Sequence, residues 1–174
     1  MARSARTTDE ARPADVLVIF GITGDLAKVM TFRSLYRLER RGLLDCPIVG
    51  VAVDVWSVDD LKERARTSIT GTGEPLDEAI FERLAARFSY ISGDFGDAET
   101  YKHVADTISE ARTPVFYLEI PPFLFGTVVA GLAAAGLTLL GVFVEGVSAS
   151  AAELAGDDQQ RTLLGAGSSA VFFA

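Results

Sequence analysis

The sequence has a single cysteine and a single histidine among its 174 residues. One cysteine excludes an internal disulfide, and its place before an apolar run predicts that Cys46 is a buried structural thiol. His103 falls on a predicted surface helix, so we expect it to have no catalytic role. Histidines, cysteines and carboxylates nowhere cluster at the spacing of metal ligands, and we therefore expect no metal site.

Basic residues are also in short supply, since 16 lysines and arginines stand against 24 aspartates and glutamates, for a net charge of −8. An acidic chain repels nucleic acid and anionic membranes, so neither is an expected partner. The N-terminus lacks the apolar segment of a signal peptide. The most apolar stretch, residues 123–145, is broken by four glycines and predicts a buried helix and strand rather than a membrane span. We therefore expect a cytoplasmic protein.

Apolar runs and helical patterns alternate along most of the chain. The runs typical of buried strands cover residues 15–20, 47–54, 88–92, 114–120 and 139–144. The segments with helical periodicity or capping residues cover 25–42, 57–68, 76–87, 98–111 and 123–135. This alternation predicts an α/β fold, a Rossmann-like doubly wound parallel sheet with helices on both faces.

The domain boundaries follow from the same patterns. We expect a flexible N-terminal tail over 1–14 and the Rossmann domain over 15–145. Residues 146–174 are rich in alanine, glycine and serine and form a second tail with no clear period, apart from a short helix over 149–156.

The first predicted helix has one apolar face. The apolar side chains at helical spacing, which we expect to face the core, are Leu26, Val29, Met30, Leu35 and Leu38. The charged side chains, which we expect mostly on the solvent side, are Arg33, Arg37, Glu39 and Arg40.

A glycine-rich turn joins the first predicted strand to this helix. Gly21 can take the sharp turn, Gly24 lets a phosphate approach the backbone, and Ala27 lets the helix pack close to the strand. The start of a helix offers unpaired N–H groups and the positive end of a dipole, which together suit a pyrophosphate. The spacing Gly-x-x-Gly-x-x-Ala departs from Gly-x-Gly-x-x-Gly, and the alternative is a plain strand-to-helix turn with two glycines.

A carboxylate, Asp54, follows the second predicted strand. In dinucleotide-binding folds a carboxylate at this place accepts hydrogen bonds from the ribose 2′-hydroxyl, whereas an arginine favours a 2′-phosphate. Asp54 therefore favours NAD over NADP. The alternative is a solvated aspartate in a turn.

Four segments in order resemble the N-terminal, coenzyme-binding domain of the glucose-6-phosphate dehydrogenase family. The segments are Phe-Gly-Ile-Thr-Gly-Asp-Leu-Ala-Lys at 20–28, Leu-Leu and Ile-Val-Gly-Val-Ala within 43–52, Tyr-Ile-Ser-Gly-Asp-Phe at 90–95 and Phe-Tyr-Leu-Glu-Ile-Pro-Pro at 116–122. The resemblance covers about residues 15–145. It implies binding of NADP or NAD, and a family reaction in which glucose 6-phosphate is oxidised to its lactone in the pentose phosphate pathway.

The resemblance also implies roles for individual residues. The residues that would line the coenzyme diphosphate are Thr23, Gly24, Asp25 and Leu26. Leu118 and Pro121 would face the nicotinamide side, and Glu145 matches the acid that ends the fifth strand.

Several family features are missing from this sequence. The arginine that pairs with the 2′-phosphate aligns with Val53, and the lysine that follows the fifth strand in the family is absent after Glu145. The motif that supplies the catalytic histidine and the large substrate domain have no counterpart. We therefore predict coenzyme binding without turnover and assign no catalytic residue.

Two other interpretations remain open. The chain could be a stand-alone nucleotide-binding or interaction module, which self-associates through the apolar surface that a lone Rossmann domain exposes. It could also be a truncated or frame-shifted product, because the resemblance ends abruptly after Glu145 and the composition changes there.

Overall fold

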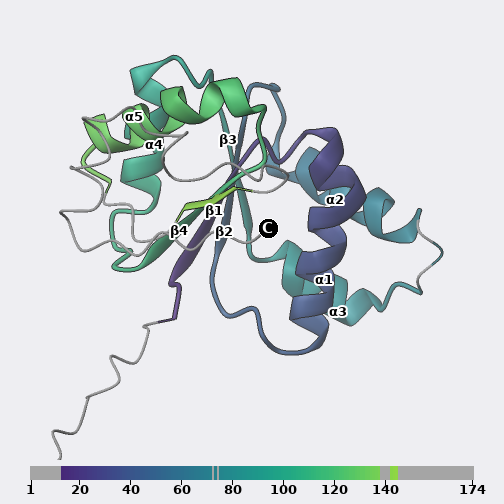
Figure 1. Ribbon diagram of the computed structural model, residues 1–174. Coiled ribbons are helices and arrows are strands. Elements are labelled where there is room, and N and C mark those ends of the chain that lie inside the picture. The colour runs from purple at the N-terminus through teal and green to yellow at the C-terminus, as the bar shows by residue number, and fades with distance from the viewer. Residues whose placement is uncertain (1–12, 72, 74, 138–141, 145–174) are drawn as a thin grey trace, which may run out of the picture.

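A computed structural model describes residues 13–71, 73, 75–137 and 142–144 (Figure 1). Most of the predicted N-terminal tail, the start of the fifth predicted strand, Glu145 and the predicted tail over 146–174 with its helix lie outside these residues. Among the described residues, no helix is long and apolar enough to cross a membrane.

Five parallel strands form a single sheet in the described part of the chain. They are β1 (Val16–Phe20), β2 (Ile48–Ala52), β3 (Phe88–Ser92), β4 (Pro114–Leu118) and β5 (Val142–Val144). Their order is β3-β2-β1-β4-β5, so the chain first builds outward from β1 and then crosses to its other side. This reversal beside β1 is the point at which open α/β sheets bind their ligands.

Helices cover both faces of the sheet, as the sequence predicts. The helices are a π-helix η1 (Ala27–Thr31), α1 (Phe32–Arg40), α2 (Val58–Thr70), α3 (Glu78–Ala85), α4 (Ala98–Thr107), a 3-10 helix η2 (Pro122–Leu124) and α5 (Phe125–Ala134). Figure 1 shows α1, α2 and α3 on one side of the sheet and α4 and α5 on the other. The Rossmann-like α/β fold predicted from the sequence is confirmed.

Each face of the sheet has its own hydrophobic core. On the side of α4 and α5, Phe20 and Leu118 are fully buried, and Phe20 packs against the Tyr101 ring at 6.2 Å between ring centroids. On the side of α1 to α3, Ile19 and Phe32 are fully buried. Each such side chain contributes about 1.5–3 kcal/mol to folding. Burial on both faces explains why β1 reads as a continuous apolar run.

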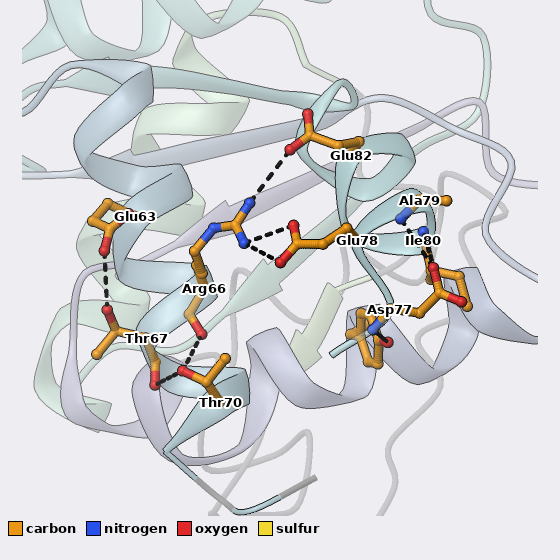
Figure 2. A network of polar contacts seen from close by, with 10 residues as sticks. Glu63, Arg66, Thr67, Thr70, Asp77, Glu78, Ala79, Ile80 and Glu82 are labelled. Atoms are coloured by element: carbon orange, nitrogen blue, oxygen red, sulfur yellow. Dashed lines mark hydrogen bonds and ion pairs between the residues drawn. The ribbon is translucent and has the colours of Figure 1, made fainter. Parts of the chain in front are cut away.

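Short polar side chains cap the N-termini of helices α2, α3 and α4. Ser57 and Asp60 form a reciprocal capping box at α2, and Asp77 and Asp97 cap α3 and α4 through their carboxylates. Each such cap contributes about 1 kcal/mol. Helices α2 and α3 are further joined by Arg66, whose guanidinium pairs with two glutamates of α3 (Figure 2).

The predicted apolar face of the first helix is wrong in two places. Val29 and Met30 are 58% and 45% exposed, although the spacing places them with the core residues. The Phe32 N–H donates to the Ala27 carbonyl, five residues back, so the chain makes a π-turn here. The extra residue in that turn shifts the phase of the helix and rotates Val29 and Met30 to solvent.

The predicted solvent exposure of Glu39 is also wrong. The carboxylate is buried on α1 and accepts hydrogen bonds from Arg83 at 3.1 Å and from Arg87 at 2.8 Å. Arg83 and Arg87, which lie beyond α2 in the chain, compensate the burial of this charge. Helical periodicity reports on one helix only and does not predict this pairing.

Candidate coenzyme site

Loops at the carboxyl ends of β1, β2 and β4 meet at one edge of the sheet. They are the turn that holds Gly21 to Gly24, the segment that begins at Val53, and the segment that begins at Glu119. Phe20, at the end of β1, is paired with a residue of β2 on one side and a residue of β4 on the other. The three strands therefore end at about the same level of the sheet. The three loops therefore meet at the topological switch point, the region where ligands bind in this class of sheet.

Gly21 is required by the path of the backbone. Its φ is +86°, and a Cβ atom there would lie 2.2 Å from the Glu119 carbonyl oxygen. Its N–H donates to the Val51 carbonyl at 2.7 Å, which ties the turn to the end of β2. Only glycine combines this left-handed conformation with so close an approach to the end of β4.

Buried side chains fix the turn from below. Ile22 and Ala27 are fully buried, and Ile22 packs so closely on β2 that a Cβ at Gly50 would lie 2.7 Å from its side chain. Ala27 thus occupies the close helix–strand contact that its small size predicts. The exposed residues of the turn, Gly24 and Asp25, are held in place by these anchors.

The start of the helix presents unpaired backbone donors. The first helical hydrogen bond here runs from the Lys28 N–H to the Gly24 carbonyl at 3.2 Å. The N–H groups of Asp25, Leu26 and Ala27 precede that bond, and the leading N–H groups of a helix have no intrahelical acceptor. An exposed glycine at position 24 leaves the approach to them open. The segment therefore fits a diphosphate, which such N–H groups and the helix dipole stabilise.

Thr23 and Asp54, 31 residues apart in the chain, are brought together. The Thr23 hydroxyl donates to the Asp54 carboxylate at 2.6 Å, and the Tyr90 hydroxyl donates to the Asp54 carbonyl at 2.7 Å. A carboxylate is thereby held at the end of β2 directly beside the glycine-rich turn. Asp54 is exposed, so its other lone pairs can accept from a ligand hydroxyl.

Trp56 and Arg64 complete this edge of the site. The Arg64 guanidinium carbon lies 5.9 Å from the centre of the Trp56 ring, and the Trp56 and Tyr90 rings lie 6.4 Å apart. One Arg64 N–H group donates weakly to the Thr23 carbonyl at 3.4 Å. Sequence analysis did not single out Arg64 because only the packing of α2 against the first helix segment places it here.

Glu119 is a second residue that sequence analysis did not assign. Its side chain is buried at the end of β4, where one carboxyl oxygen accepts from the buried Thr31 hydroxyl and the other has no partner. Burial raises the pKa of Glu119 to about 7, against a smaller opposing effect of the Thr31 hydrogen bond. The available signal was an acidic residue that interrupts the apolar run between Leu118 and Ile120.

The remaining expected site residues are placed as follows. The Leu118 side chain is fully buried in the core below α5, so only its backbone can face a ligand at the crevice. Pro121 is exposed between the end of β4 and the start of η2. Glu145 lies outside the described residues.

Two residues to which the sequence assigns no site role, His103 and Cys46, lie where the sequence predicts them. His103 is exposed on α4. Cys46 is buried, and burial raises the pKa of its thiol. Within the described residues, no group of three or more histidines, cysteines and carboxylates could hold a metal ion.

Comparison with known proteins finds similarity to glucose-6-phosphate dehydrogenases. A family model described as glucose-6-phosphate dehydrogenase, NAD binding domain, matches residues 18–145. Glucose-6-phosphate 1-dehydrogenase 1 of Mycobacterium tuberculosis is 57% identical over 120 residues, which cover 69% of this chain and 26% of that protein. Glucose-6-phosphate 1-dehydrogenase of Dickeya dadantii is 36% identical over 134 residues, 75% of this chain and 27% of that protein. The chain thus spans about 26% of the length of these curated relatives.

Solved structures agree with the sequence matches. Glucose-6-phosphate 1-dehydrogenase from Mycobacterium avium superposes with a TM-score of 0.80 at 47% identity, over 92% of this chain and 36% of that chain. A glucose-6-phosphate dehydrogenase in complex with its substrate glucose-6-phosphate gives a TM-score of 0.78 at 28% identity, over 94% of this chain and 37% of that chain. The chain belongs to the glucose-6-phosphate dehydrogenase family, and its residues 18–145 correspond to the NAD binding domain of that family.

Proposed function

We propose that this chain binds NADP or NAD in the crevice between β1 and β4 and holds the coenzyme for oxidation of glucose 6-phosphate. The observation that carries the proposal is the hydrogen bond between Thr23 and Asp54, which closes the glycine-rich turn against the end of β2. That contact supports the proposal, because a helix start suits a diphosphate and a neighbouring carboxylate suits a ribose hydroxyl. The family match over residues 18–145 supports the same assignment.

The proposed roles follow from the placement of each residue. The backbone N–H groups of Asp25, Leu26 and Ala27 would hold the diphosphate at the start of the helix. Asp54 would accept a hydrogen bond from the adenosine ribose. The nicotinamide would lie near Pro121 and the backbone of Leu118, because these residues form the side of the crevice that belongs to β4.

Chemistry on glucose 6-phosphate needs a base within hydrogen-bond reach of the sugar hydroxyl. The sole histidine of the sequence is exposed on α4 and has no part in the crevice loops. When bound, the coenzyme supplies the hydride acceptor, and the chain's own residues bind and orient it. We therefore propose coenzyme binding without turnover by this chain alone.

The test is a calorimetric titration of NAD and NADP into the 174-residue chain, followed by an assay of coenzyme reduction with glucose 6-phosphate. We expect saturable binding of at least one coenzyme and no reduction. Gly24→Val places a branched side chain over the free N–H groups and should abolish binding while the unfolding temperature stays within a few degrees. Absence of binding to the wild-type chain would refute the proposal, and turnover would refute its second half.

A second candidate, self-association, is favoured by one observation. Apolar side chains are exposed on the elements that follow β1 and β4: Val29 and Met30 of η1, and Phe123 of η2, which is 80% exposed. Large exposed apolar side chains are found at interaction surfaces. Light scattering over a range of concentrations should then show a dimer that Phe123→Asp dissociates. A monomer at every concentration would exclude this candidate.

A further inference from the structure

Arg64 is a cation beside the turn with few contacts of its own. Its contacts are the 3.4 Å hydrogen bond to the Thr23 carbonyl and the approach to the Trp56 ring. Its Nε atom is buried and has no hydrogen-bond partner. A buried guanidinium nitrogen without an acceptor is costly, so the structural contacts of Arg64 do not explain its position.

Arg66, two residues further along α2, has quite different surroundings. Its guanidinium donates to both oxygens of Glu78 at 2.7 Å and to Glu82 at 3.3 Å (Figure 2). In the described part of the chain no carboxylate lies within ion-pair distance of Arg64. One arginine of α2 therefore serves to join helices, whereas the other carries a charge that no described residue balances.

The position of that charge relates it to the ribose edge of the site. Thr23 donates to Asp54 through its hydroxyl and accepts from Arg64 through its carbonyl, so one residue contacts both the anion and the cation. The end of β2 itself offers no cation, because Val53 stands before Asp54. A 2′-phosphate at this edge would meet the repulsion of Asp54 and could be balanced only by a cation from another element.

We propose that Arg64 is the residue that binds the 2′-phosphate of NADP, so that Asp54 and Arg64 admit NAD and NADP respectively to the same site. This inference rests on the proposed coenzyme function. The planar guanidinium suits a phosphate because it offers several N–H donors in one plane. The weak hydrogen bond to Thr23 and the contact with the Trp56 ring hold the Arg64 side chain at the ribose edge of the site. Neither partner carries a negative charge, so the positive charge of Arg64 is not neutralised.

The test compares NAD and NADP, which differ only in the 2′-phosphate, by calorimetry with the wild-type chain and with Arg64→Gln. We expect Arg64→Gln to weaken NADP binding by about 10-fold or more, which is the usual size of a lost charged hydrogen bond, and to leave NAD binding within about 2-fold. Arg64→Lys, which keeps the charge, should retain a large part of the NADP affinity. Arg66→Gln is the matched control, because it removes the same charge from the same helix outside the site, and should leave the ratio of the two affinities unchanged.

Unchanged selectivity in Arg64→Gln, with NAD still bound, would overturn the role of Arg64 and leave the coenzyme function standing. Failure of the wild-type chain to bind either coenzyme would instead refute the coenzyme function and this inference with it.

A measurement on the wild-type chain gives an independent check. Trp56 is the sole tryptophan and lies against the Arg64 guanidinium, so its emission should respond to NADP more strongly than to NAD. Equal responses at saturation would count against the proposal even if Arg64→Gln proved too unstable to study.

Discussion

Replacement of Glu119 by glutamine should remove a pH dependence of folding stability. The carboxyl group titrates near 4.5 when unfolded and near 7 in the folded chain, where burial disfavours its charge. At pH values between 4.5 and 7 the folded state binds more protons than the unfolded state. The contribution of Glu119 to the free energy of unfolding is therefore largest below pH 4.5 and falls as the pH rises towards 7. Glutamine has no proton to lose, and the variant should not show this fall.

The size of the effect follows from the interval between 4.5 and about 7, which corresponds to about 3 kcal/mol. The glutamine oxygen can still accept from the Thr31 hydroxyl, while its amide group lies where a carboxyl oxygen already lacked a partner. That unpaired amide costs about 1 kcal/mol. The variant should therefore be about 1 kcal/mol less stable than wild type at pH 4.5 and about 2 kcal/mol more stable at pH 8.

Urea unfolding of both chains at several pH values from 4.5 to 8 measures this difference. At pH 8 the gain should raise the unfolding temperature by about 4–8 °C. Glu39→Gln provides the control, because Glu39 is also buried but is paired with Arg83 and Arg87. A constant difference between Glu119→Gln and wild type across the pH range would refute the reasoning.

Further predictions concern the turn, the ribose edge and two buried groups. Gly21→Ala should destabilise the fold by about 3 kcal/mol or more in urea, because its φ is +86° and the new Cβ would collide with β4. Asp54→Asn should raise NADP affinity by about 10-fold in calorimetry, because it removes a like charge beside the 2′-phosphate. Glu39→Gln should lower stability by about 1–3 kcal/mol in the same urea curves, because it weakens the pairing with Arg83 and Arg87. Cys46 should resist iodoacetamide until the chain unfolds, because burial raises the pKa of its thiol.

Local sequence pattern was sufficient to predict the fold class and the position of the glycine-rich turn. The strand before Gly21 is buried on both faces, and such strands read as continuous apolar runs whatever surrounds them. Glycine spacing and the start of a helix are likewise local properties, so the position of the turn followed from a few adjacent residues. Ser57 and Asp97 were readable as helix starts for the same reason, because a cap bonds only to its own first turn.

Contacts between distant segments needed the tertiary structure. The hydrogen bond from Thr23 to Asp54 depends on how β1 and β2 pair, and the place of Arg64 depends on how α2 packs beside the turn. The burial of Glu39 required arginines more than 40 residues away along the chain. No pattern within one helix carries that information.

The sequence by itself determined that this chain has a parallel α/β sheet with a glycine-rich turn between β1 and the first helix, because strand burial, helix capping and glycine turns are set by neighbouring residues. Only the tertiary structure decided which side chains surround that turn. The π-turn rotated Val29 and Met30 to solvent, and the end of β4 placed the carboxyl of Glu119 in a buried position. The burial of a site residue and the charges around it depend on several elements at once. They are therefore set only when those elements pack together.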